Sequence, residues 1–263
     1  GSDGTVITQD TAGAGDTHIG VIQLNSSGAS QTNPILLKNL RVEPVGMAGI
    51  SVGRFYQDTE TMVSYVEINN MEIIGTNSNP STEQERGLYV DTTSTLSHLI
   101  VNNSAFNNLT YGWYFQKQVS ADASTVEHVT VSNTEFNHNN HKGIYAEKLA
   151  NATFTGCTIS ENGFNSSALP SYFAPWSAGI DFNLKSGTYD NFSFENCAFT
   201  DNAIDEAKEG VALTIKERGT GTNPSSSYIS YPANCNNVTV TACNFTNNER
   251  GMRFGEPGKG NVG

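Results

Sequence analysis

Two carboxylates in the middle of the chain, Glu147 and Asp181, stand in a recurring pattern and could act as an acid and a base. Each belongs to an alternating segment that begins with glycine, "GIYAE" from Gly143 and "GIDF" from Gly179. If these segments are neighbouring strands, spacings of about 4.8 Å between strands and 3.3 Å along them place the two β-carbons roughly 8 Å apart. Inverting glycosidases separate their two carboxyl groups by about 6.5–9.5 Å, so hydrolysis of a glycosidic bond is a candidate chemistry. Asp205, Glu206 or Glu209, on a nearby insertion, could replace Glu147.

Aromatic and amide side chains surround this carboxylate pair in the pattern. Tyrosines stand two residues after three of the glycines, and a tryptophan lies in the insertion that precedes Gly179. Aromatic faces stack on sugar rings, and planar polar groups bind sugar hydroxyls. We therefore expect the substrate-binding residues to be Tyr89, Tyr114, Tyr145, Trp176, Asn183 and Lys185.

The glycine segments that would carry these residues recur along the whole chain. In each segment the glycine is followed by an apolar residue, a residue expected to point outward and a second apolar residue. The segments begin at Gly49, Gly87, Gly112, Gly143, Gly179, Gly210 and Gly251. A second alternating segment follows within each unit, for example "VTVSNTEF" and "FSFENCAF". Short segments of period two with variable connections, and no helical periodicity, predict an all-β solenoid in which every coil stacks on the preceding one. One apolar column should then point inward, formed by Ile50, Leu88, Trp113, Ile144, Ile180, Val211 and Met252.

Two further columns come from aligning the second segments. Asparagines recur at one position, at Asn39, Asn70, Asn103, Asn133 and Asn196, and their amides could form a ladder. The next position holds Cys157, Cys197 and Cys243, which should be buried, stacked and reduced, whereas Cys235 is expected in a loop. Asparagines three residues after the aromatic position are expected to adopt unusual turn angles, namely Asn139, Asn162, Asn202 and Asn248.

These repeats resemble the right-handed parallel β-helix of the pectate-lyase-like superfamily, in which a Gly-Ile strand is followed by an alternating strand and an Asn-containing turn. The resemblance covers residues 20–263 and implies a single β-helix domain of about seven to eight coils, with residues 1–19 as an N-terminal cap or approach segment. It implies a carbohydrate-active scaffold, but such scaffolds carry many chemistries. Polysaccharide lyases on this scaffold use a basic residue, for which Lys148, Lys185 and Lys216 are candidates. Paired aspartates with a Gly-His-Gly, typical of the family's polygalacturonases, do not occur.

The charge of the chain narrows the choice of partner. Lys and Arg number 14 against 26 Asp and Glu, a net charge of −12, which repels nucleic acid, anionic membranes and polyuronates. No apolar run is long enough to cross a bilayer, and no pattern of metal ligands is present, so neither a metal nor a cofactor is expected. Gly1 and Ser2 look like a cloning remnant, so a secretion signal could have been removed.

The sequence thus predicts a monomeric hydrolase of a neutral oligo- or polysaccharide, part of a larger secreted or surface protein of a bacterium. A non-catalytic glycan-binding or adhesin module is the alternative, and a lyase is less favoured because the chain is acidic. Ice binding is suggested by outward threonines such as Thr130 and Thr153, but Glu195 interrupts that face and the coils are irregular.

Overall fold

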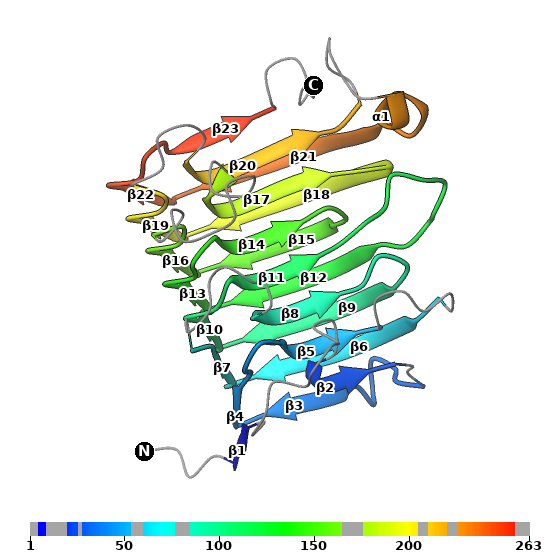
Figure 1. The fold of residues 1–263 in the computed structure, drawn as a ribbon, viewed down its shortest axis with the longest axis vertical. Coiled ribbons are helices and arrows are strands. Elements are labelled where there is room, and N and C mark those ends of the chain that lie inside the picture. Colours follow the sequence, from blue (N-terminus) through cyan, green and yellow to red (C-terminus); the bar gives the residue numbers. More distant parts are fainter. Residues whose placement is uncertain are drawn as a thin grey trace.

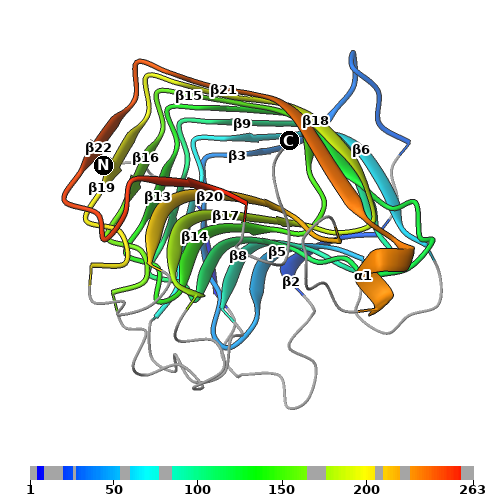
Figure 2. The same ribbon diagram turned by 90° about the horizontal axis from the view of Figure 1, so that it is seen from above.

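The structure of this chain is a right-handed parallel β-helix. The computed structural model describes residues 5–8, 20–25, 28–53, 60–76, 85–164, 176–204, 210–219 and 226–255. Within them the strands form three sheets, and every pairing between named strands is parallel (Figure 1). Viewed along the stack, successive coils superpose and the sheets form three sides of one column (Figure 2). The sheets have eight, eight and seven strands, which confirms the predicted number of coils.

The first sheet, here the glycine-strand sheet, consists of the predicted glycine segments. Its strands in spatial order are β2 (Gly20–Leu24), β5 (Ala48–Val52), β8 (Arg86–Val90), β11 (Tyr111–Phe115), β14 (Lys142–Ala146), β17 (Ala178–Leu184), β20 (Val211–Glu217) and β23 (Met252–Phe254). A helix, α1 (Ser226–Ser230), lies between β20 and the next strand.

The predicted second segments are split between the other two sheets. The long-strand sheet contains β3 (Ile35–Lys38), β6 (Met62–Asn69), β9 (Thr95–Asn102), β12 (Val126–Ser132), β15 (Ala150–Thr155), β18 (Gly187–Glu195) and β21 (Ala233–Thr241). The short-strand sheet contains β1 (Thr5–Thr8), β4 (Leu40–Glu43), β7 (Glu72–Ile74), β10 (Ala105–Asn107), β13 (Glu135–Asn137), β16 (Thr158–Ser160), β19 (Ala198–Thr200) and β22 (Asn244–Thr246). Residues 1–19, expected as a cap or approach segment, include β1, which pairs with β4.

The predicted asparagine column explains this split. Its members have positive φ, as in Asn70 (52°) and Asn133 (47°), and so do Gly156 and Ala242 at the same position. A left-handed residue turns the chain sharply, and asparagine tolerates that conformation better than most residues. The column therefore marks the corner between the two sheets. Its amides also form part of the predicted ladder, with Asn70 Nδ2 donating to Asn39 Oδ1 at 2.8 Å.

Four other asparagines, predicted as turn residues with unusual backbone angles, form a second ladder, in which Asn139, Asn162 and Asn202 are buried and Asn248 is half-buried; Asn162 and Asn202 do lie in turns. Asn139, Asn162, Asn202 and Asn248 do not have positive φ, so the predicted angles are wrong; the residue before each of them does. The side-chain amides of Asn139, Asn162 and Asn202 each donate to the side-chain oxygen of the asparagine in the next coil, at 2.8–2.9 Å. Each also donates to a backbone carbonyl of the preceding coil. These buried amides are thereby paired from coil to coil.

Close backbone contact between coils accounts for the repeated glycine. A β-carbon on Gly87 or Gly112 would lie 2.4 or 2.3 Å from the carbonyl oxygen of the next coil's glycine. No side chain fits at such a distance, so this position selects glycine. In the seventh coil the position is occupied by Ala212, because Val211 pairs with Ala178.

That pairing corrects the predicted register of β20 by two residues. Leu213, rather than Val211, joins the inward column beside Ile180, and Thr214, rather than Ala212, stands beside Asp181. The other inward residues are buried as predicted, except Met252, which is 48% exposed because β23 ends the stack.

The cysteine column is confirmed in its main features. All four cysteines are free, Cys157 and Cys197 are buried, and Cys243, in the last coil, is half-buried. The backbone N–H of Cys197 donates to Cys243 Sγ at 3.4 Å. Cys235 is not in a loop: it lies in β21 and is buried.

Substitution of Asn162 by Ala should lower the free energy of unfolding by about 3 kcal/mol, because buried groups in both neighbouring coils would lose hydrogen bonds. Urea unfolding measures this change. Asn133→Gly is the matched control, since it removes an exposed ladder amide and glycine accepts the positive φ; its cost should stay below about 1 kcal/mol. Equal losses in the two variants would show that the buried ladder does not stabilise the fold.

Thiol titration without reductant should detect four free groups in the denatured protein. In the native protein Cys243 should react first, because the other three thiols are buried. Fewer than four groups after denaturation would contradict the free thiols of the structure.

Candidate functional site

Asp181, the predicted acid or base, lies between two lysines on the outer side of the glycine-strand sheet. It is 2% exposed, and its carboxylate oxygens are 2.8 Å from Lys142 Nζ and 2.9 Å from Lys216 Nζ. Burial alone would raise the pKa of Asp181, but the two ammonium groups hold it well below its usual range. Burial also lowers the pKa of Lys216 to about 8. Asp181 is therefore a charged, enclosed carboxylate that cannot readily hold a proton for a leaving group.

Glu147, its predicted partner, is equally enclosed. The hydroxyl of Tyr145 donates to its carboxylate at 2.7 Å, and the backbone N–H of Lys117 donates at 2.8 Å. Lys185 forms an ion pair with the same carboxylate. The structure thus gives Glu147 three partners within the protein, and the predicted substrate-binding residues Tyr145 and Lys185 are two of them.

The three predicted sugar-stacking tyrosines stack on one another. The ring centroids of Tyr89 and Tyr114 are 5.9 Å apart, and those of Tyr114 and Tyr145 are 5.2 Å apart. The guanidinium of Arg86 lies 4.8 and 4.6 Å from the centroids of Tyr89 and Tyr114, and Lys142 Nζ lies 4.3 Å from that of Tyr145. These ring faces contact cations of the protein, an arrangement that stabilises the enclosed sheet face.

The remaining predicted site residues are placed as follows. Asn183 is buried, donates to the Tyr145 hydroxyl at 2.9 Å and accepts from Arg218. Trp176 is half-buried two residues before β17. Asp205, Glu206 and Glu209 lie outside the described residues. The structure thus places Tyr145, Glu147, Asn183 and Lys185 side by side, as the pattern predicts, and joins them in a mostly buried polar network.

Lys148, a candidate lyase base, is also enclosed. Its ammonium group donates to the backbone carbonyls of Asp91, Thr92 and Ser94 at 2.6–3.1 Å and to the hydroxyl of Ser124. Burial lowers its pKa to about 7. Because four acceptors surround the ammonium group, Lys148 links the turns of successive coils and is not directed toward solvent.

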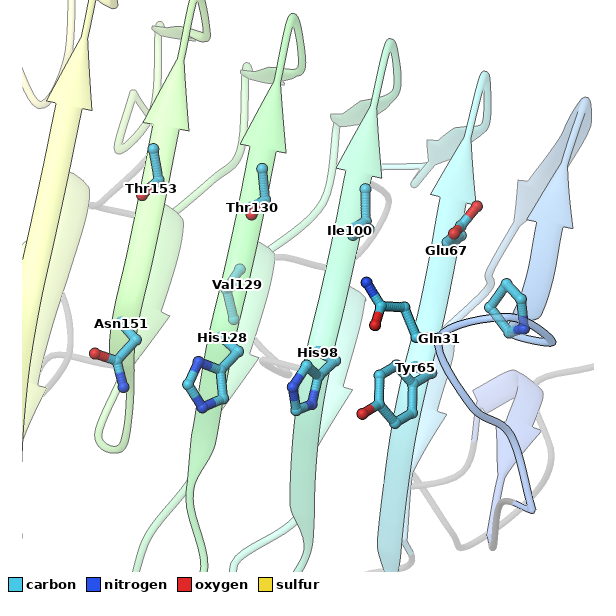
Figure 3. A pocket seen from close by; sticks show the side chains of 11 residues that line it. Gln31, Tyr65, Glu67, His98, Ile100, His128, Val129, Thr130, Asn151 and Thr153 are labelled. Carbon is cyan, nitrogen blue, oxygen red and sulfur yellow. The ribbon is translucent and has the colours of Figure 1, made fainter.

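An open groove lies on the outer face of the long-strand sheet, away from these residues (Figure 3). Its volume is about 410 Å³, and it crosses β6, β9, β12 and β15. One row of lining residues consists of Tyr65, His98, His128 and Asn151, and the parallel row consists of Glu67, Ile100, Thr130 and Thr153. Gln31 lies near Tyr65 and Glu67 (Figure 3), and Pro34 also lines the groove.

The first row exists because six of the seven long strands, all except β3, have one left-handed residue at the same place. The φ angles are 54° at Tyr65, 56° at His98, 55° at His128 and 49° at Asn151. The column continues beyond the groove with Asn191 in β18 and Asn237 in β21. The side-chain amide of Asn191 donates to Asn151 Oδ1 at 2.8 Å, and that of Asn237 donates to Asn191 Oδ1 at 3.0 Å. A left-handed residue disrupts the regular alternation, as in a β-bulge, and keeps these side chains on the outer face.

The rings of this row form a continuous stack. The centroids of Tyr65 and His98 are 4.4 Å apart, and those of His98 and His128 are 4.7 Å apart. Both imidazoles are exposed, so their ring edges reach solvent and can donate or accept hydrogen bonds. A ligand lying along the groove would meet one such edge per coil.

The sequence contained a signal for this row. The alignment of second segments that revealed the asparagine corner also places Tyr65, His98 and His128 at one position, each preceding a buried residue. The insertions flank the glycine segments instead, so the sequence pattern pointed to the glycine-strand sheet, whose outer face is enclosed.

Among the residues that the structure describes, no group of three His, Cys, Asp or Glu side chains could hold a metal ion. No helix in the described part of the chain is long and apolar enough to span a bilayer.

Comparison with known proteins identifies one family. The family model described as "Right handed beta helix region" matches residues 18–199 and, in a second overlapping alignment, residues 61–261. No curated protein and no solved structure matches the chain.

Asp181→Asn should destabilise the protein by about 3–5 kcal/mol at pH 7, because two buried ammonium groups would lose their counter-charge. The folded-state pKa of Asp181 is depressed, so its contribution is present above the unfolded pKa of about 3.9 and is lost as the pH falls below it. The difference between wild type and variant in urea unfolding should therefore shrink below about pH 4. Glu72→Gln, which breaks the exposed pair with Arg41, is the control and should cost less than about 1 kcal/mol. A difference that is constant with pH would exclude this role for the Asp181 charge.

Proposed function

The chain belongs to the family of proteins with a right-handed β-helix region, and we propose that it is a glycan-binding domain whose ligand lies in the groove on the long-strand sheet. The fold alone does not assign a function, because this scaffold carries many. The observation that supports the proposal is the row of stacked rings, Tyr65, His98 and His128, at the side of an open groove. A secreted or cell-surface location is part of this proposal.

The chemistry of the groove suits a sugar chain. Imidazole edges, amides and hydroxyls provide donors and acceptors for sugar hydroxyls, and Ile100 and Pro34 provide apolar contact for C–H groups. The repeat of the β-helix places equivalent groups about 4.8 Å apart along the groove. An extended ligand with a repeating unit can therefore form similar contacts with successive coils, and each contact adds to the affinity.

Binding is favoured over the predicted hydrolysis. General acid catalysis needs a carboxyl group that reaches the substrate and holds a proton. Asp181 and Glu147 are both buried and paired with lysines, and Asp181 is held in its charged form. The groove has a single carboxylate, Glu67, among its lining residues, whereas a glycosidase of the usual kind uses two.

Replacement of His98 and His128 by asparagine should abolish most of the glycan affinity while preserving the fold. Asparagine occupies the same column at Asn151 and Asn191 with the same backbone conformation, so the change removes the rings without backbone strain. A glycan array should identify the ligand, and titration calorimetry should show a loss of about tenfold or more in affinity.

Asn191→Gly, in the same column but outside the groove, should bind as wild type does. A reducing-sugar assay on the array's ligands should show no release of product. Unchanged binding by the double variant would place the ligand elsewhere, and product formation that Asp181→Asn abolishes under conditions where the variant is still folded would restore the hydrolase hypothesis.

A further inference from the structure

We propose that the groove selects a glycan with free, positively charged amino groups, and that Glu67 binds the ammonium group. This inference rests on the proposed function, and it replaces the neutral glycan expected from the sequence with a cationic amino-sugar polymer. Its basis is the position of one carboxylate and the charge of the sheet around it.

Glu67 is a half-buried carboxylate between apolar neighbours. In the sheet it stands between Leu36 of β3 and Ile100 of β9, both of them exposed apolar residues. Across the described part of the chain it has no hydrogen-bond or ion-pair partner, in contrast to the buried carboxylates Glu147 and Asp181. A carboxylate that is partly removed from water gains most from a cation that approaches from the ligand side.

Glu67 is the acceptor in the groove that suits an ammonium group, because a protonated amine has donors and no acceptor and its contact with a carboxylate is charge-assisted. Gln31 lies between the two rows, and the Tyr65 hydroxyl points toward His98 (Figure 3). The hydroxyls of the same sugar can therefore contact the Gln31 amide and the row of rings while its ammonium group contacts Glu67. An N-acetyl group would remove the charge, and a uronate would bring a second carboxylate toward Glu67.

The charge of the whole sheet favours the same class of ligand. The seven long strands contain four acidic residues, Glu67, Glu127, Asp190 and Glu195, and one basic residue, Lys38, in addition to the two histidines. The complete chain has a net charge of −12. Such a field concentrates polycations at the surface and repels polyanions. The groove and the field around it therefore both favour a cationic glycan.

The two rows of the groove favour a sugar over a basic peptide. A lysine side chain could satisfy Glu67, but its flexible stem would leave the imidazole edges and the threonine row without partners. An amino sugar carries its ammonium and hydroxyl groups on one rigid ring, so one unit can contact Glu67 and the next can contact the adjacent coil.

The test compares oligomers of glucosamine, N-acetylglucosamine and glucose of equal length by titration calorimetry, at a pH of about 6 where amines are charged. Wild type should bind the glucosamine oligomer about tenfold or more tightly than the other two, the effect expected of one charge-assisted contact. Glu67→Gln should remove this preference and leave the affinity for the uncharged oligomers within about twofold.

Glu127→Gln is the matched control, because it removes one charge from the same sheet outside the groove. It should keep the preference, and both variants should unfold at the wild-type urea concentration. An oligolysine of equal charge should bind more weakly than the glucosamine oligomer. If oligolysine binds as tightly and Glu67→Gln weakens it equally, the site recognises charge alone and the amino-sugar assignment is wrong.

The two proposals fail in different ways. Equal affinity of wild type for all three oligomers, with binding still lost in the double histidine variant, would overturn the amino-sugar inference and keep the glycan-binding function. Absence of binding to any oligomer and to the glycan array would overturn both.

Discussion

The stacking of each coil on the preceding one at strand spacing is the constraint on which this structure depends. Hydrogen bonds between parallel strands hold neighbouring coils about 4.8 Å apart, so a residue at one position contacts the residue at the same position in the next coil. At the glycine position this spacing leaves no room for a side chain, since a β-carbon on Gly112 would lie 2.3 Å from the oxygen of Gly143. The residue at each position must therefore fit the residues at the equivalent position in the coils above and below, and this restricts the variation between coils.

The same constraint produces ladders of like residues, and each ladder has a different physical role. Phenylalanine rings stack in the core, as between Phe106 and Phe136 with centroids 5.3 Å apart. Amides such as Asn162 satisfy one another in the buried ladder. On the long-strand sheet the ladder of rings from Tyr65 to His128 remains open to solvent, and there it can serve recognition.

Buried side chains of like charge cannot stack from coil to coil, because they repel one another. The glycine-strand sheet avoids this repulsion by placing opposite charges next to one another. Its outer face is enclosed, and carboxylates alternate there with lysines from neighbouring coils, as in the group formed by Lys142, Asp181 and Lys216. Removal of one member would leave a buried charge without a partner, which is costly. Each buried charge of this network has a partner in a neighbouring coil, whereas Glu67, the one carboxylate among the described residues that line the groove, has no such partner within the described chain.

The sequence by itself determined the repeat, the direction in which most side chains point, and the columns of asparagine and cysteine, because a period of two and a recurring motif encode direction and stacking. It did not determine the register of β20, because an insertion of unknown path precedes that strand and a shift by two residues keeps every side chain on the same face. Nor could it show that Asp181 and Glu147 are enclosed: periodicity indicates that a residue points away from the core but not what lies over it. Only the tertiary structure, which places Tyr65, His98 and His128 on the uncovered face, decided where a ligand can lie.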